Sequence, residues 1–374
     1  MKIRAAVLNQ AAAVLPYSIS KPLSIEEIEI DPPGPSEVLV RMGSAGLCHS
    51  DLSAIDGSRP RPTPMVIGHE AAGTVEEVGP GVDDLRRGDR VVLTFIPSCG
   101  HCLHCAEGRP ALCEPAAAAN AAGTLLSGSR RLHRNGTAIH HHLGCSAFAE
   151  FSTVSRRSLV RIDPELSFEE AALFGCAVLT GVGAVLNTAR VRAGSTVAVV
   201  GLGGVGLCSV LGAVVAGARR IIAVALFEHK LAVAMSLGAT DAFNASDPDC
   251  IRQIRSATNG GVEFAFELAG SVKAMELACM ITGRGGITVT AGLPPTADTI
   301  SIPHGNLVVE ERTIKGSYFG SCVPVRDLPR YVALYREGRL PVNKLVTGKL
   351  KLEEINTGFD QLQQGTAIRQ IILF

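Results

Sequence analysis

Four apolar runs in the second half of the chain have the length and composition of buried strands. They are TVAVV (196–200), IIAVALF (221–227), VEFAFEL (262–268) and GITVTAG (286–292). Stretches with helical patterning lie between them, and this alternation is typical of a doubly wound parallel sheet. The pattern predicts an α/β unit in this part of the chain.

The first hundred residues follow another pattern. Short strand-like stretches are interrupted by Pro and Gly, beginning with a first strand in MKIRAAVLNQ, and this predicts mostly antiparallel β structure. Residues 194–218 carry no charge, which is long enough for a membrane helix. The turn GLGGVG within that run argues against such a helix.

Composition adds limits on size and partners. The 374 residues suit about two domains, 47% of them are apolar, and 35 Lys and Arg balance 35 Asp and Glu. This balance argues against nucleic acid or an anionic membrane as partner. We expect a globular protein that handles small molecules.

The stretch CGHCLHCAEGRPALC has the spacing C-x2-C-x2-C-x7-C. Its thiols are Cys99, Cys102, Cys105 and Cys113. Disulfides between such close neighbours are awkward, and a cytoplasmic location keeps thiols reduced. Four thiolates suit a closed structural zinc site.

An iron–sulfur cluster and unligated thiols are the alternatives for this lobe. The bacterial ferredoxin run places its fourth cysteine sooner and follows it directly with proline. Here Pro115 comes two residues after Cys113. His101 and His104 could also replace a sulfur ligand.

The GLGGVG turn follows an apolar strand and precedes a helical stretch. Gly201, Gly203 and Gly206 match G-x-G-x-x-G, in which glycine permits the tight turn, the approach of a pyrophosphate and close packing of helix on strand. Amide groups at the helix start then meet the phosphates. The turn predicts a dinucleotide site.

The end of the second strand lacks the acidic residue that binds the adenosine ribose in such sites. Ala225 stands there. Without a carboxylate at this position, NAD loses a charged hydrogen bond, about 1.5–3 kcal/mol, and the 2′-phosphate of NADP meets no like-charge repulsion. His229 and Lys230 could attract that phosphate, whereas Glu228 opposes it or could serve NAD. We expect NAD or NADP, with a slight lean to tolerance of NADP.

Further reactive residues are scattered along the chain. GLCHSD contains Cys48, GHE contains His69, and FGCAVLTG contains Cys176. None is specific alone, because a single cysteine is usually a small buried hydrophobe and a single histidine is usually just hydrogen-bonded.

Together, the motifs resemble the zinc-dependent medium-chain alcohol dehydrogenases over essentially the whole length. GLCHSD, GHE, the four-cysteine lobe, the isolated GC, GLGGVG and the closing GFDQLQQGTAIRQIILF follow the order of that family, in its long, class I/III-like, dimeric form. The resemblance implies a GroES-like, mostly antiparallel β catalytic domain at 1–178 and 319–374, with the zinc lobe at 97–115. A doubly wound parallel-sheet Rossmann domain at 179–318 would bind the cofactor.

The resemblance also implies the residues of a catalytic zinc site. Cys48, His69 and Cys176 would bind the ion, which leaves a fourth position open. Asp51 would orient His69, and Glu70 would lie close to the metal. The alternative for both acids is a solvated surface pair.

Proton transfer is implied at Ser50, which would hydrogen-bond the substrate hydroxyl. Many relatives end the relay with histidine five positions after the metal cysteine, where this chain has Ser53. His49 would contact the pyrophosphate. The implied cofactor residues are His49, Thr180, Gly201, Gly203, Gly204, Val205, Gly206, Ala225, Lys230 and Arg369.

The implied activity is reversible hydride transfer between a primary or secondary alcohol and NAD(P), with two zinc ions per subunit. Residues expected at the substrate are Arg59, Phe95, Ala118, His142 and Leu143. One alternative is a glutathione-dependent formaldehyde dehydrogenase, which would carry arginine where this chain has Ala117. Another is a dinucleotide-binding module without activity. The long loop at 115–136 is typical of dimeric members, so we expect a cytoplasmic homodimer.

Overall fold

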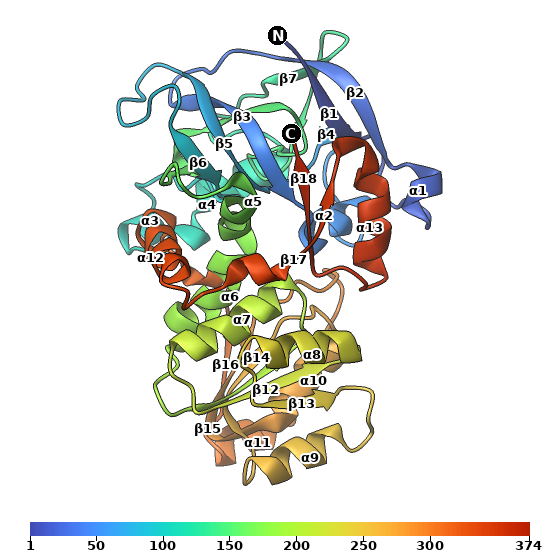
Figure 1. The fold of residues 1–374 in the computed structure, drawn as a ribbon, viewed down its shortest axis with the longest axis vertical. Helices are drawn as coiled ribbons and strands as arrows, with labels where there is room; N and C mark the ends of the chain where they lie inside the picture. Colours follow the sequence, from blue (N-terminus) through green and yellow to red (C-terminus); the bar gives the residue numbers. More distant parts are fainter. The chain divides into compact units, whose positions relative to one another are not determined.

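The computed structural model describes residues 1–374, and the chain divides into two compact units. Unit 1 comprises residues 1–176, 323–332 and 342–374, and unit 2 comprises 177–322 and 333–341. The boundaries expected from the resemblance were 178 and 319. Both units are drawn in Figure 1.

Unit 1 is built on two sheets whose strands pair mainly antiparallel. A closed barrel has the order β1-β2-β7-β8-β4, and a seven-stranded sheet has the order β10-β6-β5-β3-β18-β17 with β9 on β3. The strands are β1 (Lys2–Leu8), β2 (Leu23–Ile30), β3 (Glu37–Gly46), β4 (Met65–Val66), β5 (Glu70–Val78), β6 (Arg90–Leu93), β7 (Leu132–Arg134), β8 (Thr137–His141), β9 (Phe151–Ser155), β10 (Leu159–Arg161), β17 (Val346–Leu350) and β18 (Arg369–Leu373).

Alternation of side chains along the strands forms the barrel core. Ile3, Ala5 and Val7 of β1 point to one face and pack with Ile28 and Ile30 of β2. This follows from the period of two in a strand. The helices of this unit are α1 (Tyr17–Ser20), α2 (His49–Ile55), α3 (Leu103–Ala106), α4 (Glu114–Ala122), α5 (Phe168–Leu173), α13 (Ile355–Gln363) and most of α12 (Pro324–Arg336).

Unit 2 contains a six-stranded sheet, β13-β12-β11-β14-β15-β16, in which every pair is parallel. Its elements are α6 (Leu179–Gly183), β11 (Thr196–Val200), α7 (Gly204–Val215), β12 (Arg220–Ala225), α8 (Glu228–Ser236), β13 (Asp241–Asn244), α9 (Cys250–Ala257), β14 (Val262–Glu267), α10 (Val272–Ile281), β15 (Thr282–Thr290), α11 (His304–Val309) and β16 (Thr313–Gly316). In Figure 1, α7 and α8 lie in front of this sheet.

The opposite face of the parallel sheet is also covered. Ala198 and Val200 of β11 pack with Ile254 of α9 and Ala278 of α10. Helices on both faces explain why these strands read as continuous apolar runs. The predicted α/β class, with an antiparallel unit and a doubly wound parallel unit, is confirmed.

The uncharged run at 194–218 forms β11 and α7. Another helical stretch, 168–189, is apolar and long enough to cross a membrane, but 83% of its 18-residue window is buried inside the protein. Such burial is typical of a helix in a protein core.

Candidate active site and metal centres

Cys48, His69 and Cys176 come together in unit 1. Cys48 caps the start of α2, His69 directly precedes β5, and Cys176 follows α5 in a wide helical turn, Phe174–Val178. Their donor atoms all lie within 4.8 Å of one another, and all three residues are buried. His69 Nε2 is 3.3 Å from Cys176 Sγ.

Two glycines make this convergence possible. Gly68 has φ +100°, and a Cβ there would lie 2.6 Å from the backbone nitrogen of Phe148. A Cβ on Gly175 would lie 2.3 Å from the carbonyl oxygen of Leu93. A larger residue before either ligand would displace the backbone that holds it.

The protonation of the two sulfurs is linked. A hydrogen bond from Cys176 lowers the pKa of the Cys48 thiol, and the same bond raises the pKa of Cys176. The positive charge of Arg369 also favours a Cys48 thiolate. Two sulfurs and an imidazole at this separation are a donor set that fits zinc, with an open fourth position.

Asp51 lies behind His69. Its Oδ1 is 2.8 Å from His69 Nδ1, and its Oδ2 accepts a hydrogen bond from the backbone N–H of Cys48 at 3.1 Å. The side chains of Asp51 and His69 are both buried. Nδ1 is therefore the protonated nitrogen. Nε2 faces the sulfurs with its lone pair available to bind a metal ion.

A third group of potential ligands is Asp51, His69 and His142. The 2.8 Å separation of Asp51 and His69 is a hydrogen-bond length and leaves no room for an ion between them. We therefore interpret these three residues as surroundings of the Cys48–His69–Cys176 cluster and not as a separate metal site.

Glu70 and Arg369 form a buried pair beside the cluster. Arg369 Nη1 is 3.6 Å from Glu70 Oε2 and donates to the carbonyl of Leu47 at 3.1 Å. Neither Glu70 oxygen has a hydrogen bond. Burial raises the pKa of Glu70 to about 7, against the opposing pull of Arg369. Arg369, expected at the pyrophosphate, is only 3% exposed.

The relay residues lie on α2. Ser50 Oγ is 3.9 Å from Cys48 Sγ. Ser53 donates its hydroxyl hydrogen to the carbonyl of His49 at 2.9 Å, and the His49 side chain is exposed.

The expected substrate residues divide into two groups. Phe95, His142 and Leu143 are buried, and the Phe95 ring lies edge-on to His69 with centroids 5.4 Å apart. Ala118 is exposed on α4, and Arg59 is half-buried.

The sequence interpretation missed Asn120 near this cluster. It is buried on α4 and donates to the carbonyl of Phe95 at 2.9 Å. The sequence places Asn120 in a run of alanines, where the only available signal was its polarity.

The four lobe cysteines converge separately. Cys99, Cys102, Cys105 and Cys113 have sulfurs within 4.8 Å of one another. Cys113 Sγ accepts from the N–H of Cys99, and Cys99 Sγ accepts from the N–H of Cys102, both at 3.2 Å. Burial opposes ionisation of Cys99, but the N–H groups of His101 and Cys102, which both donate to its sulfur, lower its pKa to about 6. All eleven cysteines are free thiols.

The glycine turn in unit 2 leads into α7, whose first residue is Gly204. Gly201 has φ +94°, and a Cβ there would lie 2.5 Å from Ala269 N. A Cβ on Gly206 would lie 1.9 Å from the carbonyl oxygen of Gly201, whereas Gly203 faces open space. The turn and the start of α7 have the form expected of a phosphate-binding turn. Val205 lies in the first turn of α7, and Thr180 is buried in α6.

Glu267, at the end of β14, is a second missed residue. The buried carboxylate accepts from the N–H groups of Ala269 (2.9 Å) and Gly270 (2.6 Å) and from the Thr290 hydroxyl (2.8 Å). It therefore fixes the loop that lies against Gly201. An acidic residue ending an apolar strand was the signal that could have found it.

The end of β12 carries Ala225, which pairs in register with Asn244 of β13. Asn244 Nδ2 donates to Glu228 Oε1 at 2.7 Å. Lys230 is half-buried, with Nζ 5.2 Å from the centre of the Phe227 ring, and burial lowers its pKa. The carboxylate of Glu228 is thus engaged on the β13 side.

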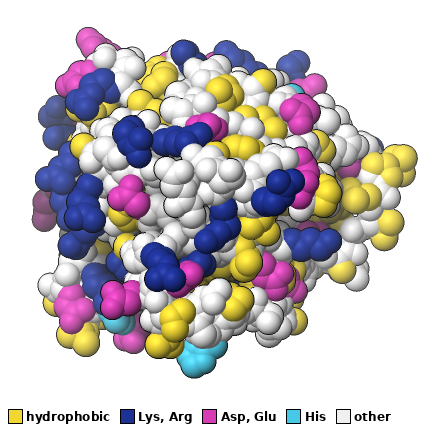
Figure 2. All heavy atoms as spheres, turned by 90° about the horizontal axis from the view of Figure 1, so that it is seen from below, with side chains coloured by type: hydrophobic (Ala, Val, Ile, Leu, Met, Phe, Trp, Pro, Cys, Tyr) yellow, Lys and Arg dark blue, Asp and Glu magenta, His cyan; other side chains and the backbone are white.

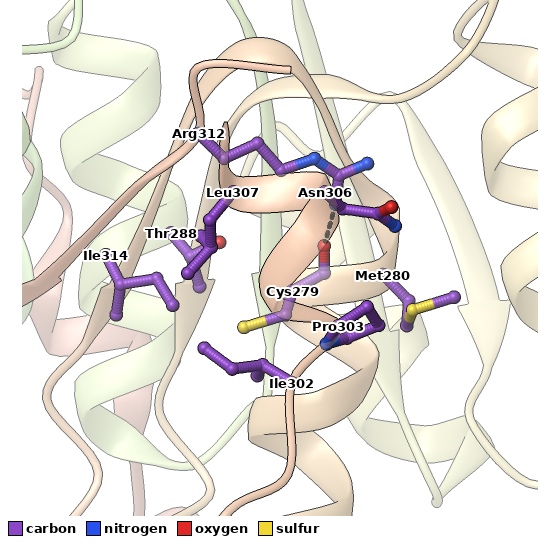
Figure 3. Close-up of a pocket in the computed structure, with 9 residues that line it drawn as sticks. All are labelled: Cys279, Met280, Thr288, Ile302, Pro303, Asn306, Leu307, Arg312 and Ile314. Atoms are coloured by element: carbon purple, nitrogen blue, oxygen red, sulfur yellow. Dashed lines mark hydrogen bonds between the residues drawn. The ribbon is translucent and has the colours of Figure 1, made fainter. Parts of the chain in front are cut away.

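A pocket in unit 2 is lined by none of the predicted site residues. It lies among α10, β15, α11 and β16 (Figure 3). Arg312 at this pocket donates to the carbonyl of Cys279 at 2.7 Å and pairs with Glu310. The remaining lining is mainly apolar.

Surface charge is mixed. On the face shown in Figure 2, Asp and Glu side chains lie among the Lys and Arg side chains, so neither sign covers the face alone. This agrees with the formal net charge of zero.

Comparisons with known proteins define the class. Residues 34–164 match the model of the alcohol dehydrogenase GroES-like domain, and residues 204–337 match that of zinc-binding dehydrogenases. A Mycobacterium tuberculosis (strain CDC 1551 / Oshkosh) protein named "Putative alcohol dehydrogenase D" is 40% identical over 98% of this chain and 100% of its own length. The fold and the cysteine–histidine cluster are those of a zinc-binding oxidoreductase.

Two solved structures are similar over 100% of this chain and 99% of their own. One is an alcohol dehydrogenase zinc-binding domain protein from Burkholderia ambifaria, with 36% identity and a TM-score of 0.94. The other is benzyl alcohol dehydrogenase from Acinetobacter calcoaceticus, with 32% identity and a TM-score of 0.93. The chain belongs to the zinc-dependent medium-chain alcohol dehydrogenase family.

Proposed function

We propose that this protein reversibly oxidises primary or secondary alcohols with NAD(P), using zinc held by Cys48, His69 and Cys176. The observation that carries the proposal is a buried set of three donors with an imidazole oriented by Asp51. When bound there, Zn²⁺ supplies Lewis acidity that lowers the pKa of an alcohol.

The protein's own residues would manage the proton and the geometry. Asp51 fixes the His69 tautomer, and Arg369 offsets negative charge at Cys48. Ser50, near Cys48, would accept a hydrogen bond from the substrate hydroxyl and pass the proton outward. Ser53, bonded to the His49 carbonyl, would continue the relay through water.

The second zinc would occupy the four-cysteine lobe. Four sulfurs could complete a tetrahedral shell, so an ion held there would have no open position and would contribute to stability. Unit 1 would act as the catalytic domain, and unit 2 would bind the cofactor through its glycine turn.

Cofactor choice is proposed to include NADP. Ala225 offers no carboxylate to the ribose diol, Asn244 engages Glu228, and the half-buried Lys230 leaves a cation nearby. A cation removed from water favours an anion as partner. His49 and Thr180 are the further cofactor contacts that the resemblance implies.

The substrate is proposed to be an uncharged alcohol bounded by Phe95 and Leu143. Benzyl alcohol belongs in the test panel because a 32% identical structure carries that name. S-(hydroxymethyl)glutathione tests the alternative of a glutathione-dependent formaldehyde dehydrogenase. Ala117 does not support that alternative, because its methyl group lacks the positive charge of the expected arginine.

A homodimer is proposed in the cytoplasm, where thiols stay reduced. Strand β16 pairs only with β15, so its other edge is open. Val308 and Val309, at the end of the preceding helix α11, are exposed and add apolar surface. An open, partly apolar edge favours pairing with a second chain.

The decisive experiment measures metal content and turnover together. We expect two zinc ions per chain, and removal of one by a chelator should abolish oxidation of an alcohol panel with NAD and NADP. Full cofactor binding without turnover of any panel member by zinc-loaded protein would instead support a binding module.

A further inference from the structure

His142 lies against Asp51, although the sequence interpretation placed it only beside the substrate. The ring is 1% exposed, and its Nδ1 is 3.3 Å from Asp51 Oδ1. This nitrogen makes no hydrogen bond by strict geometry, and Asp51 Oδ1 is the polar atom that lies beside it. A buried polar atom of this kind calls for an explanation.

The Asp51 carboxylate faces three nitrogen atoms. Oδ1 lies near Nδ1 of both His69 and His142, and Oδ2 accepts from the Cys48 N–H. An ionised carboxylate can only accept. His142 Nδ1 therefore carries its proton, because otherwise two lone pairs would oppose each other.

A tight turn fixes the His142 ring. The His142 carbonyl accepts from the N–H groups of Cys145 (2.9 Å) and Ser146 (3.1 Å), and its own N–H donates to the Ser146 hydroxyl at 3.1 Å. Leu143 in this turn has φ +51°. The backbone thus delivers the imidazole directly to Asp51, beyond the end of β8.

His142 and Phe95 both flank His69. The His69 ring lies edge-on to His142 at 5.8 Å and to Phe95 at 5.4 Å between centroids. Only His142 adds a polar atom near Asp51. Phe95 therefore provides a matched comparison for packing without the polar contact.

We propose that His142 is a positioning residue of the metal centre, whose Nδ1–H holds the Asp51 carboxylate that orients His69. The proposal rests on the proposed zinc site at Cys48, His69 and Cys176. Loss of partners outside the ligand shell typically costs 10–100-fold in metal affinity. Since His142 acts through Asp51, we expect a loss of about tenfold.

The test compares His142→Asn, His142→Gln and His142→Phe. The amide nitrogen of Asn can take the place of Nδ1, whereas the longer Gln places its amide nearer to Nε2. Zinc affinity is measured by chelator competition on fully loaded protein, with release from the four-cysteine lobe as an internal reference. Phe95→Leu is the packing control.

The proposal expects about tenfold weaker zinc binding at one site in His142→Gln and His142→Phe. His142→Asn should stay within about threefold of the wild type, and Phe95→Leu likewise. Unchanged zinc affinity in His142→Gln, with an altered KM for the alcohol, would overturn the proposal. His142 would then only line the substrate site. Equal losses in Asn and Gln variants would also overturn it.

Failure of the His142 proposal can be told apart from failure of the proposed function. If His142→Phe does not fold, the Asn and Gln comparison still decides. Absence of zinc at the three-donor cluster in the wild type would sink the proposed function itself, independently of any His142 variant.

Discussion

Replacement of Glu267 tests how the cofactor turn is held in place. The carboxylate is 1% exposed and accepts from two backbone N–H groups and one hydroxyl. In Glu267→Ala the N–H groups of Ala269 and Gly270 lose their acceptor. Ala269 is exposed and Gly270 is half-buried, so water can replace the lost acceptor. At about 0.5–1.5 kcal/mol for each lost hydrogen bond, the free energy of unfolding should fall by about 1–3 kcal/mol.

The conservative variant separates charge from connectivity. In Glu267→Gln the amide oxygen can still accept from both N–H groups, and the amide nitrogen can donate to Thr290. We expect a loss of about 1 kcal/mol or less, because only the charge-assisted part disappears.

Cofactor binding should follow the same order. Ala269 N lies 2.5 Å from where a Cβ on Gly201 would be, so a shifted loop disturbs the glycine turn. Fluorescence titration with NADH and NADPH should show about tenfold weaker binding in Glu267→Ala and about twofold in Glu267→Gln. Thermal and denaturant unfolding give the stability values.

Equal destabilisation by Ala and Gln would refute this reasoning, because the loss would then follow the negative charge alone. Wild-type cofactor affinity in a folded Glu267→Ala protein would refute the link between the loop and the glycine turn.

Three further changes probe other parts of the protein. Asp51→Asn removes the charged acceptor of His69 and should weaken zinc binding at one site by about 10–100-fold in chelator competition, leaving the lobe zinc unchanged. Ala225→Asp should raise the ratio of kcat/KM for NAD over NADP by at least about tenfold, since it adds a ribose acceptor and repels the 2′-phosphate. Val308→Asp with Val309→Asp should convert a dimer to a monomer in light scattering, because charge opposes burial of this surface.

Contrary results for these three changes are equally specific. Unchanged zinc affinity in Asp51→Asn would remove the carboxylate from the metal centre. A fixed cofactor ratio in Ala225→Asp would place the ribose elsewhere, and an intact dimer in the double variant would exclude α11 from the interface.

Much of the fold could be read from apolar periodicity. The runs at 196–200, 221–227, 262–268 and 286–292 became β11, β12, β14 and β15. Strands β13 (DAFN) and β16 (TIKG) were not predicted, because four residues with polar members carry no clear period. Their pairing with longer neighbours in the sheet decides their conformation.

The sequence by itself determined the class of protein and the ligand types, because cysteine, histidine and glycine spacing reflects local chain geometry. Only the tertiary structure decided which groups meet: residues 48, 69 and 176 lie far apart in sequence yet share one buried cluster. The contacts of Asp51 with His142, Glu70 with Arg369, and Glu267 with Thr290 likewise join separate elements. Such contacts arise from the packing of sheets and turns, and no local pattern encodes which partner a buried polar group will find.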